Sequence, residues 1–238
     1  VPLRASWLRA LALELERIAN HLGDLGALGN DAGFAFGLAQ FSRLKEHLLR
    51  ATEQALGQRY LLDLVVPGGT RNDLAPAGAA GLDACLVQLT DEVTVVRGIY
   101  EEHTGLRDRF AGAGAVLPDL ATWLGLVGLA GRASGQALDL RVDAACTPYE
   151  ELAVRRCTQQ DGDVLARVTL RFDELVESVR IVRRILRAMP SGACAIAVPV
   201  PETGAVGVGF IEAWRGPVIV GLEAGPDGSI LRCHPQDP

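Results

Sequence analysis

The chain has 238 residues, of which 49% are hydrophobic and 22% are charged, and its formal net charge at neutral pH is −6. This length and composition predict one large globular domain, or one domain with a small appendage. The acidic balance without a basic patch argues against nucleic-acid binding. No run of 18 apolar residues and no signal-peptide pattern is present, so neither a membrane span nor secretion is expected.

The five cysteines are far apart in the sequence, and no two of them form a CxxC pair. An odd number of cysteines at wide spacing is typical of reduced, buried thiols in a cytoplasmic protein. The four histidines are not paired at metal-ligand spacing either. We therefore expect no metal site within this chain.

The first helix is predicted from apolar residues at spacings of three and four, which form one face. They are Leu8, Leu11, Leu15, Ile18, Leu22 and Leu25. Three glycines weaken the end of this helix, and a loop rich in Gly, Asn and Asp is expected over residues 29–33. The second helix carries the apolar residues Leu38, Phe41, Leu44, Leu48 and Ala55.

Proline and glycine end regular structure at residues 66–73. A long third helix is then predicted at residues 77–110, and an irregular, glycine-rich region at residues 112–161. A fourth helix is predicted at residues 164–189, where a Pro-Ser-Gly sequence stops it.

Short β-rich runs occupy the tail at residues 206–214, 217–223 and 229–233, with turn signals between them. The expected fold class is therefore mainly α: an up-and-down helical bundle core with a small C-terminal antiparallel β meander. We expect the helical core to cover residues 1–190, and a β-rich appendage packed on this core to cover residues 191–238.

A polar row flanks the apolar face of the first helix, because Glu14, Arg17, His21 and Asp24 also repeat at three and four residues. One interpretation is a solvated face with weak salt bridges, and the periodicity alone favours it. The other is a titratable row that faces a partner or a buried channel.

Asp31 lies in the predicted loop between the first two helices, where an aspartate commonly caps a helix or closes a turn. Gly68 and Gly69 form a loop that permits the close approach of a cofactor or of a neighbouring backbone. This loop is neither a dinucleotide fingerprint nor a P-loop. The residues alone thus indicate a helix-rich domain with no self-contained active site.

Five stretches of the sequence carry motifs that occur together, in this order, in one family. They are residues 14–22 (ELERIANHL), 67–69 (PGG), 131–149 (GRASG, then DLR, then PY), 162–178 (GD, then R, R, E and S) and 209–216 (GFIEAWRG). The chain therefore resembles the large subunits of membrane-bound nickel–iron hydrogenases of the formate hydrogenlyase type and the 49-kDa subunit of respiratory complex I.

The resemblance implies a subunit of a membrane-attached complex that couples electron transfer to ion translocation. In the hydrogenases, two CxxC pairs hold a nickel–iron centre. In complex I, the equivalent cavity binds quinone beside an iron–sulfur cluster of a neighbouring subunit. The implied partners are a small iron–sulfur subunit and other subunits of the complex, which would hold the chain on the cytoplasmic side of the inner membrane.

Neither CxxC pair is present in this sequence. We therefore expect a fragment of the large subunit that lacks both metal-binding ends, holds no cofactor and is inactive alone. An oxidoreductase subunit is one interpretation of the complete protein. The alternatives are a metal-free, hydrogenase-related scaffold or coupling subunit, and a free-standing helical interaction domain.

The resemblance also implies roles for individual residues. Asp31 matches an acidic residue that lies near the quinone in complex I and helps couple its reduction, so Asp31 is the coupling candidate. Arg17 and His21 match the helix beside the same cavity, and Gly68 and Gly69 match the glycine loop of the family. We expect these five residues to line the cofactor cavity of the complete subunit.

Three positions distinguish the two branches of the family. Leu61 and Val66 stand where the complex I pattern places a histidine and an arginine near the terminal iron–sulfur cluster, which argues against a complex-I-like contact to that cluster. Trp214 stands where complex I usually has a proline, and it favours the hydrogenlyase branch.

Overall fold

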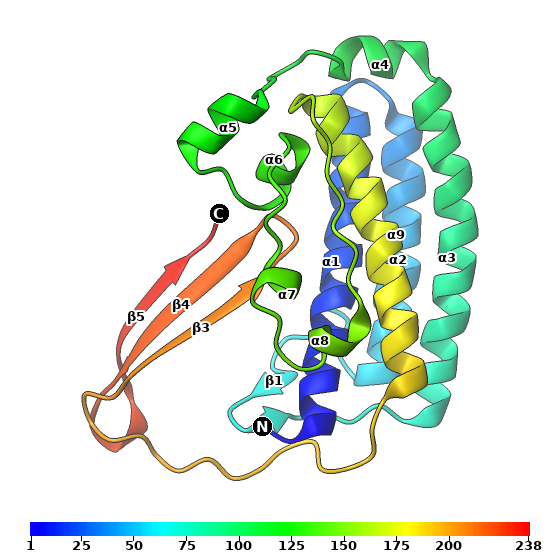
Figure 1. Cartoon of the computed structure of the whole chain (residues 1–238). Helices are drawn as coiled ribbons and strands as arrows, with labels where there is room; N and C mark the ends of the chain where they lie inside the picture. The colour runs from blue at the N-terminus through cyan, green and yellow to red at the C-terminus, as the bar shows by residue number, and fades with distance from the viewer.

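Four long helices form the body of the molecule (Figure 1). The computed structural model describes residues 1–238, and its long helices are α1 (Leu3–Asp31), α2 (Ala35–Leu56), α3 (Pro76–Glu102) and α9 (Val164–Ala188). Successive long helices run in opposite directions, as in an up-and-down bundle. Both α1 and α3 contact α2 and α9, so the core lies between the four helices.

The interior of this bundle is made by most of the apolar positions that the periodicity identified, and Leu38 of α2, which is 38% exposed, is an exception. All six apolar residues of the predicted face of α1 are buried, and so are Leu82, Leu86, Leu89, Val93 and Val96 of α3. Burial of such side chains is the main favourable contribution to folding. The predicted mainly helical fold class is confirmed. No helix combines the length and the apolar character that a crossing of a bilayer requires.

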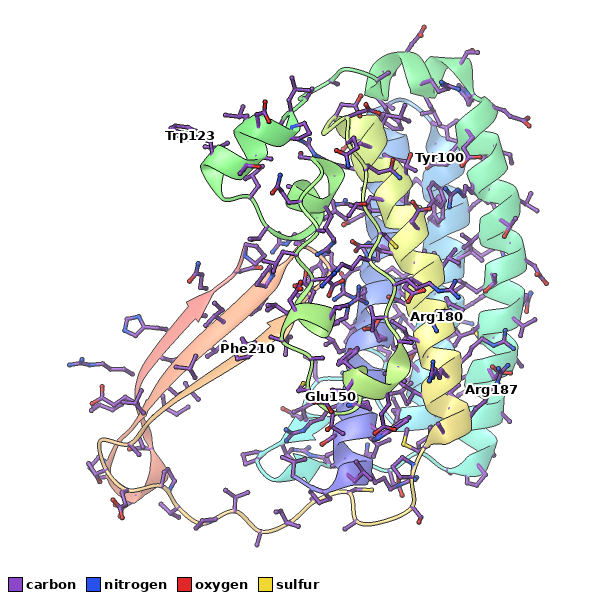
Figure 2. All side chains as sticks on the ribbon, viewed as in Figure 1. Tyr100, Trp123, Glu150, Arg180, Arg187 and Phe210 are labelled. Atoms are coloured by element: carbon purple, nitrogen blue, oxygen red, sulfur yellow. The ribbon has the colours of Figure 1, made fainter.

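The helix α1 continues as far as Asp31, so the loop that was predicted over residues 29–33 is wrong. Gly29 explains the difference, because a Cβ atom at this position would lie 2.2 Å from the hydroxyl oxygen of Tyr100. Tyr100, labelled in Figure 2, extends from α3 and donates a hydrogen bond to the carbonyl oxygen of Leu25 on α1. The glycine therefore permits close helix packing inside α1 instead of ending it.

The predicted third helix at residues 77–110 is two helices, α3 and α4 (Thr104–Phe110), so the single continuous helix is wrong. His103 between them has an extended backbone conformation, and its Nδ1 accepts a hydrogen bond from the backbone N–H of Leu106. A side-chain acceptor at this position begins a new helix.

The region expected to be irregular contains four short helices, of which α6, α7 and α8 lie beside α1 and α9 while α5 lies further out (Figure 1). They are α5 (Pro118–Leu124), α6 (Gly128–Ala133), α7 (Leu140–Asp143) and α8 (Tyr149–Leu152). Each of these helices is too short for the spacing of apolar residues to reveal it in the sequence. α6 and α8 contact α9, whereas Trp123 of α5 is 81% exposed and extends away from the body (Figure 2).

The glycine loop forms a hairpin of two short antiparallel strands, β1 (Val65–Val66) and β2 (Gly69–Thr70), near the start of α1. Arg9 of α1 holds this hairpin by donating hydrogen bonds to the carbonyl oxygens of Val66 and Gly69. The hairpin is therefore attached to the first turns of α1.

The two glycines of this hairpin lie against the backbone of the segment that follows α9. A Cβ atom on Gly68 would lie 2.2 Å from the carbonyl oxygen of Ile196, and one on Gly69 would lie 2.0 Å from that of Cys194. Of the two interpretations of the loop, the close approach of a neighbouring backbone is thus the one that this structure contains.

A three-stranded antiparallel sheet closes the chain, as predicted. Its strands are β3 (Val206–Glu212), β4 (Pro217–Ala224) and β5 (Ile230–Gln236), with β4 in the middle. The β3–β4 register pairs Glu212 with Pro217 near the body and Val206 with Glu223 at the far end. The far end projects from the bundle (Figure 1). Val206, at this end, is 74% exposed. A domain division between residues 190 and 191 stays a prediction.

All five cysteines are free thiols. Cys146 and Cys233 are exposed, so the expectation of buried thiols is wrong for these two residues. Cys85, Cys157 and Cys194 are partly buried.

The substitution Gly69→Ala is expected to lower the free energy of unfolding by about 1–3 kcal/mol, because the new methyl group would displace the backbone of Cys194. Gly81→Ala is the matched control. Gly81 lies in α3, where an added Cβ atom would meet nothing within 4 Å, so alanine there should stabilise the chain by up to about 1 kcal/mol. Urea unfolding of both variants measures the difference. Equal changes in the free energy of unfolding for the two variants would contradict the close approach of Gly69 to the backbone of Cys194.

Candidate functional site

The polar row of α1 is buried inside the protein. Glu14, Arg17 and His21 are 0%, 1% and 0% exposed, because α9 and the segment that contains α6 to α8 cover them. The interpretation of the row as a solvated face is therefore wrong for these three residues. Only Asp24 remains partly exposed, and it forms an ion pair with Arg171 of α9 at 3.0 Å.

His21 and seven charged side chains form one group, which we call the ion cluster. Its charged members are Glu14, Arg17, Arg132, Asp139, Arg141, Glu174 and Glu212. They come from α1, α6, the α7 region, α9 and β3. Four carboxylates face three guanidinium groups, which leaves a formal excess of one negative charge when His21 is neutral. Burial of each charge costs several kcal/mol unless it is paired, so the pairing geometry decides whether the cluster is stable.

Arg132 is the central cation of the ion cluster. Its Nε donates to Glu174 Oε1 and its Nη1 donates to Glu212 Oε1, both at 2.7 Å. The second carboxylate oxygen of Glu212 accepts a hydrogen bond from the backbone N–H of Leu140 at 3.2 Å. Arg132 therefore joins α6 to α9 and to the end of β3 through charge-assisted hydrogen bonds, which are stronger than neutral ones.

Arg141 joins α7 to α1. Its guanidinium donates to both oxygens of Asp139 at 2.8 and 3.1 Å, and to both oxygens of Glu14 at 3.2 and 3.3 Å. The hydroxyl of Tyr149 donates to Glu14 Oε1 at 2.9 Å. Burial and the neighbouring Glu14 charge raise the pKa of Tyr149 well above its usual value, so the hydroxyl keeps the proton that it donates.

Arg17 has the weakest pairing of the three arginines. Its Nη2 donates to the backbone carbonyl oxygen of Glu212, which fastens the end of β3 to α1. Its closest carboxylates are those of Glu14 at 3.7 Å and Glu174 at 3.8 Å, and its Nε and Nη1 have no hydrogen-bond partner. Burial accordingly lowers the pKa of Arg17, whereas the closer carboxylates raise the pKa values of Arg132 and Arg141 in spite of their burial.

His21 Nε2 lies 3.2 Å from Glu174 Oε2, but in an alignment too poor for a hydrogen bond. Burial lowers the pKa of His21, and this outweighs the attraction of Glu174, which Arg132 already neutralises. Burial alone would raise the pKa of Glu174, but the guanidinium groups of Arg132 and Arg17 outweigh burial and hold this pKa well below its usual range. Glu174 is therefore ionised and His21 is neutral at pH 7.

Two cavities, with volumes of about 290 and 190 Å³, are both lined by Glu16 and Trp214, and the smaller one touches the ion cluster at Arg17. We call them together the Trp214 crevice. The larger cavity lies between α1, α2 and residues 59–62, and Leu61 is part of its lining. The smaller cavity lies between α1 and the β3–β4 hairpin and reaches Arg17. Arg17 thus belongs both to the ion cluster and to the wall of the crevice.

The five residues predicted to line a cofactor cavity do not converge in this structure. Gly68 and Gly69 lie near the start of α1, Arg17 and His21 lie in its middle, and Asp31 is its last residue. The ten residues between His21 and Asp31 correspond to about 15 Å of helix. Their role as the lining of a cavity in a complete subunit stays a prediction.

Asp31 is exposed and forms no side-chain hydrogen bond or ion pair. The N-cap of α2 is Phe34, whose side chain accepts no hydrogen bond, so Asp31 is not the cap of the second helix. The alternative of a helix-capping aspartate is therefore wrong.

Sequence reasoning did not predict Arg132, Asp139, Arg141, Glu174 and Glu212 as site residues. All five lie in the motifs that carry the family resemblance, and the structure brings these motifs together around α1. The available signal was the presence of charged residues within otherwise apolar segments, because such residues are rarely buried unless they are paired. The pairing itself required the tertiary structure.

The residues of this chain do not suit a nickel–iron centre. No group of three or more His, Cys, Asp and Glu side chains is placed to hold a metal ion. The thiols are dispersed over α3, the α7–α9 connection, the segment after α9 and β5, and so offer no thiolate pair.

The substitution Glu174→Gln is expected to lower the free energy of unfolding by about 3–5 kcal/mol, because it leaves the buried Arg132 without one of its two carboxylates. Asp237→Asn is the matched control, since it breaks an exposed ion pair with Arg215 whose expected worth is about 0–1 kcal/mol. Chemical denaturation monitored by circular dichroism measures both. A similar small loss for the two variants would show that the ion cluster does not hold the fold together.

Comparison with known proteins gives relatives along most of the chain. A subunit of the NADH-quinone oxidoreductase of Thermosipho melanesiensis is 30% identical over 87% of this chain and 56% of its own length. Formate hydrogenlyase subunit 5 of Escherichia coli is 31% identical over 91% of this chain and 38% of its own length. The carbon monoxide-induced hydrogenase of Rhodospirillum rubrum is 29% identical over 94% of this chain and 62% of its own length. The chain thus spans roughly half the length of these relatives.

The fold has a counterpart in a solved structure. A chain of the membrane-bound sulfane sulfur reductase, an archaeal respiratory membrane complex, superposes with a TM-score of 0.92 and 25% sequence identity. The superposition covers all of this chain and 66% of that chain. Residues 31–204 also match the family model of the respiratory-chain NADH dehydrogenase 49-kDa subunit. The chain therefore belongs to the family of the complex I 49-kDa subunit and the nickel–iron hydrogenase large subunit.

Proposed function

We propose that this chain acts within a membrane-attached oxidoreductase complex that couples electron transfer to ion translocation. The observation that carries the proposal is the extent of the similarity. Relatives named as subunits of quinone oxidoreductases and of hydrogenases align over 87–94% of the chain, and the solved structure of a respiratory membrane complex covers all of it. The chain would contribute the helical body of the large subunit.

The ion cluster supports a role in coupling. Charges interact far more strongly in a buried site of low dielectric than in water, so a change of charge in the Trp214 crevice would act on the cluster through Arg17. Asp31, at the far end of α1, is the coupling candidate that the family resemblance adds. Arg17 and His21 in the middle of α1 and the glycine hairpin near its start complete the proposed cavity-lining set.

The partners in this proposal are a small iron–sulfur subunit and the membrane subunits of the complex, which would hold the chain on the cytoplasmic side of the inner membrane. The redox group of the complete large subunit would be a nickel–iron centre or a quinone. A nickel–iron centre would need donors from outside these residues, because this chain offers no suitable set.

The alternative function is a metal-free scaffold or coupling subunit related to the hydrogenases. One observation favours it. Leu61, which lines the larger cavity, cannot form the polar contact that the complex I pattern makes with a histidine.

This chain purified alone is expected to retain no nickel, since it has no thiolate pair to bind it. Elemental analysis after incubation with Ni²⁺ and gel filtration measures the bound metal, and stoichiometric nickel would contradict the expectation. The same analysis on the native complex separates the candidate functions. Stoichiometric nickel with hydrogen turnover supports a hydrogenase, nickel-free quinone reduction supports the complex I type, and absence of both supports the scaffold.

The substitution Asp31→Asn in the native complex is expected to lower turnover severalfold and to leave assembly intact, because Asp31 makes no structural contact within the chain. Asp91→Asn on the exposed face of α3 is the matched control and should leave turnover unchanged. Turnover and subunit composition after gel filtration are the two measurements. Loss of subunits in the Asp31 variant would assign the residue a structural role instead.

A further inference from the structure

The break between α3 and α4 depends on the side chain of His103. The backbone of this residue is extended, with φ of −76° and ψ of 99°, so α3 ends and α4 begins here. Its ring nitrogen Nδ1 accepts a hydrogen bond from the backbone N–H of Leu106 at 3.1 Å. The same N–H also donates to the carbonyl oxygen of His103 at 3.0 Å. The imidazole is therefore the N-cap of α4.

Two neighbouring residues fix the place of the imidazole over the first turn of α4. The centroids of the His103 and Phe34 rings lie 4.8 Å apart. A Cβ atom on Gly105 would lie 3.2 Å from Cε1 and 3.5 Å from Nδ1 of the His103 ring. Glycine weakens a helix, but at this position its missing side chain leaves the room that the ring occupies. The capping position of the imidazole is thus set by packing as well as by its hydrogen bond.

The cap requires the neutral form of the ring. A neutral imidazole has one acceptor nitrogen, whereas both nitrogens of the protonated ring are donors. Protonation at Nδ1 would place an N–H of the ring against the N–H of Leu106, and a positive charge at a helix N-terminus is unfavourable as well. His103 is exposed, so a proton reaches its ring directly from the solvent.

No other side chain in the first turn of α4 can replace this cap, because the turn contains no acidic residue. With seven residues, α4 is also too short to be stable without its contacts. Leu106 and Phe110 anchor the helix in the core, where they are 1% and 5% exposed. Loss of the cap therefore weakens the first turn and does not unfold the whole helix.

The charged side chains at this end of the bundle lie on α1, α3, α4 and α9 (Figure 1). They are Asp31 of α1, Glu101 and Glu102 of α3, Arg107, Asp108 and Arg109 of α4, and Arg167 and Arg171 of α9. None of them forms an ion pair with His103, and residues 35–42 at the start of α2 carry no charge. No ionic partner therefore takes part in the exchange between the two forms of the ring.

We propose that His103 is a pH-sensitive cap of α4, in which the neutral ring closes the first turn of the helix and protonation of the ring opens it. In the opening step, a proton passes from hydronium to Nδ1, so that one N–H bond forms and water is left. The same proton returns to water when the pH rises. The cap is therefore present at high pH and is lost as the pH falls.

The opening of this turn would reach the segment that joins α1 to α2. Arg109 of α4 donates a hydrogen bond from Nη1 to the carbonyl oxygen of Ala32, the residue after Asp31. Phe34, against which the His103 ring packs, is the N-cap residue of α2. An effect on coupling at Asp31 rests on the proposed function, whereas the cap and its response to pH do not.

Nuclear magnetic resonance of the whole chain tests the proposal through the backbone amide of Leu106. The variant His103→Asn keeps a capping side chain that cannot be protonated, and the loss of ring signals in this variant assigns those of His103. Hydrogen exchange of the Leu106 amide is compared between the wild-type chain and this variant at pH 8 and at the lower pH where the His103 ring signals show the protonated form. Both chains have the same intrinsic exchange rate at a given pH, so the ratio of their rates reports on the cap.

We expect equal exchange rates at pH 8 and about fivefold faster exchange in the wild-type chain at the lower pH, which is the size expected for the loss of an N-cap. A ratio that is the same at the two pH values would overturn the proposal. A His103 ring that stays neutral until the chain unfolds would overturn it too.

Two further variants separate the cap from other effects of pH. His103→Ala has no cap at any pH, so its Leu106 amide should exchange faster than that of His103→Asn at both pH values, and equal rates would show that the side-chain hydrogen bond does not close the turn. His47→Asn is the matched control, because His47 is exposed in the middle of α2 and caps no helix, so this variant should behave as the wild-type chain does. These measurements use the chain without its partners and stand apart from the tests of nickel and of turnover.

Discussion

The two hydrogen-bonded ion pairs of Arg132 connect parts of the chain that are otherwise remote. Glu174 lies 42 residues away on α9, and Glu212 lies 80 residues away on β3. Because all three groups are buried, none can be satisfied by bulk solvent if a partner leaves, and the loss of one charge destabilises the other two. The short helices of residues 118–152 are held by this pairing and the parallel contacts of Arg141 together with a few buried apolar side chains, such as Leu129 and Leu152.

The helix α1 is the element that both the packing and the ion cluster share. One side of it carries the leucine face of the bundle core, and the adjacent side carries Glu14, Arg17 and His21. Its 29 residues contain no proline, so the helix extends without interruption over about 43 Å. Close packing at Gly29 and the hydrogen bonds of Arg9 to the glycine hairpin fasten its two ends.

The bundle could be predicted because leucine and valine periodicity reports directly on helix faces, and the sheet because β-rich runs alternate with turns. The helix break at His103 could not, since it depends on one side-chain hydrogen bond. The extension of α1 to Asp31 depends on the room that Gly29 leaves for Tyr100, which only the tertiary structure shows. In the same way, the sequence indicated Arg17 and His21, but not that Arg132, Arg141 and Glu174 would surround them. Charged residues have no period that identifies their partners.

The projecting sheet affects how readily molecules of this protein associate with one another. An outer strand presents unpaired N–H and C=O groups that can add a strand from another molecule. The outer strand β5 limits this, because Pro235 has no N–H and the Arg232 side chain is 70% exposed. Val206 and Ile230 nevertheless expose apolar surface at the far end of the sheet. Association between molecules at high concentration should therefore begin at this sheet, while the helical bundle is still fully folded.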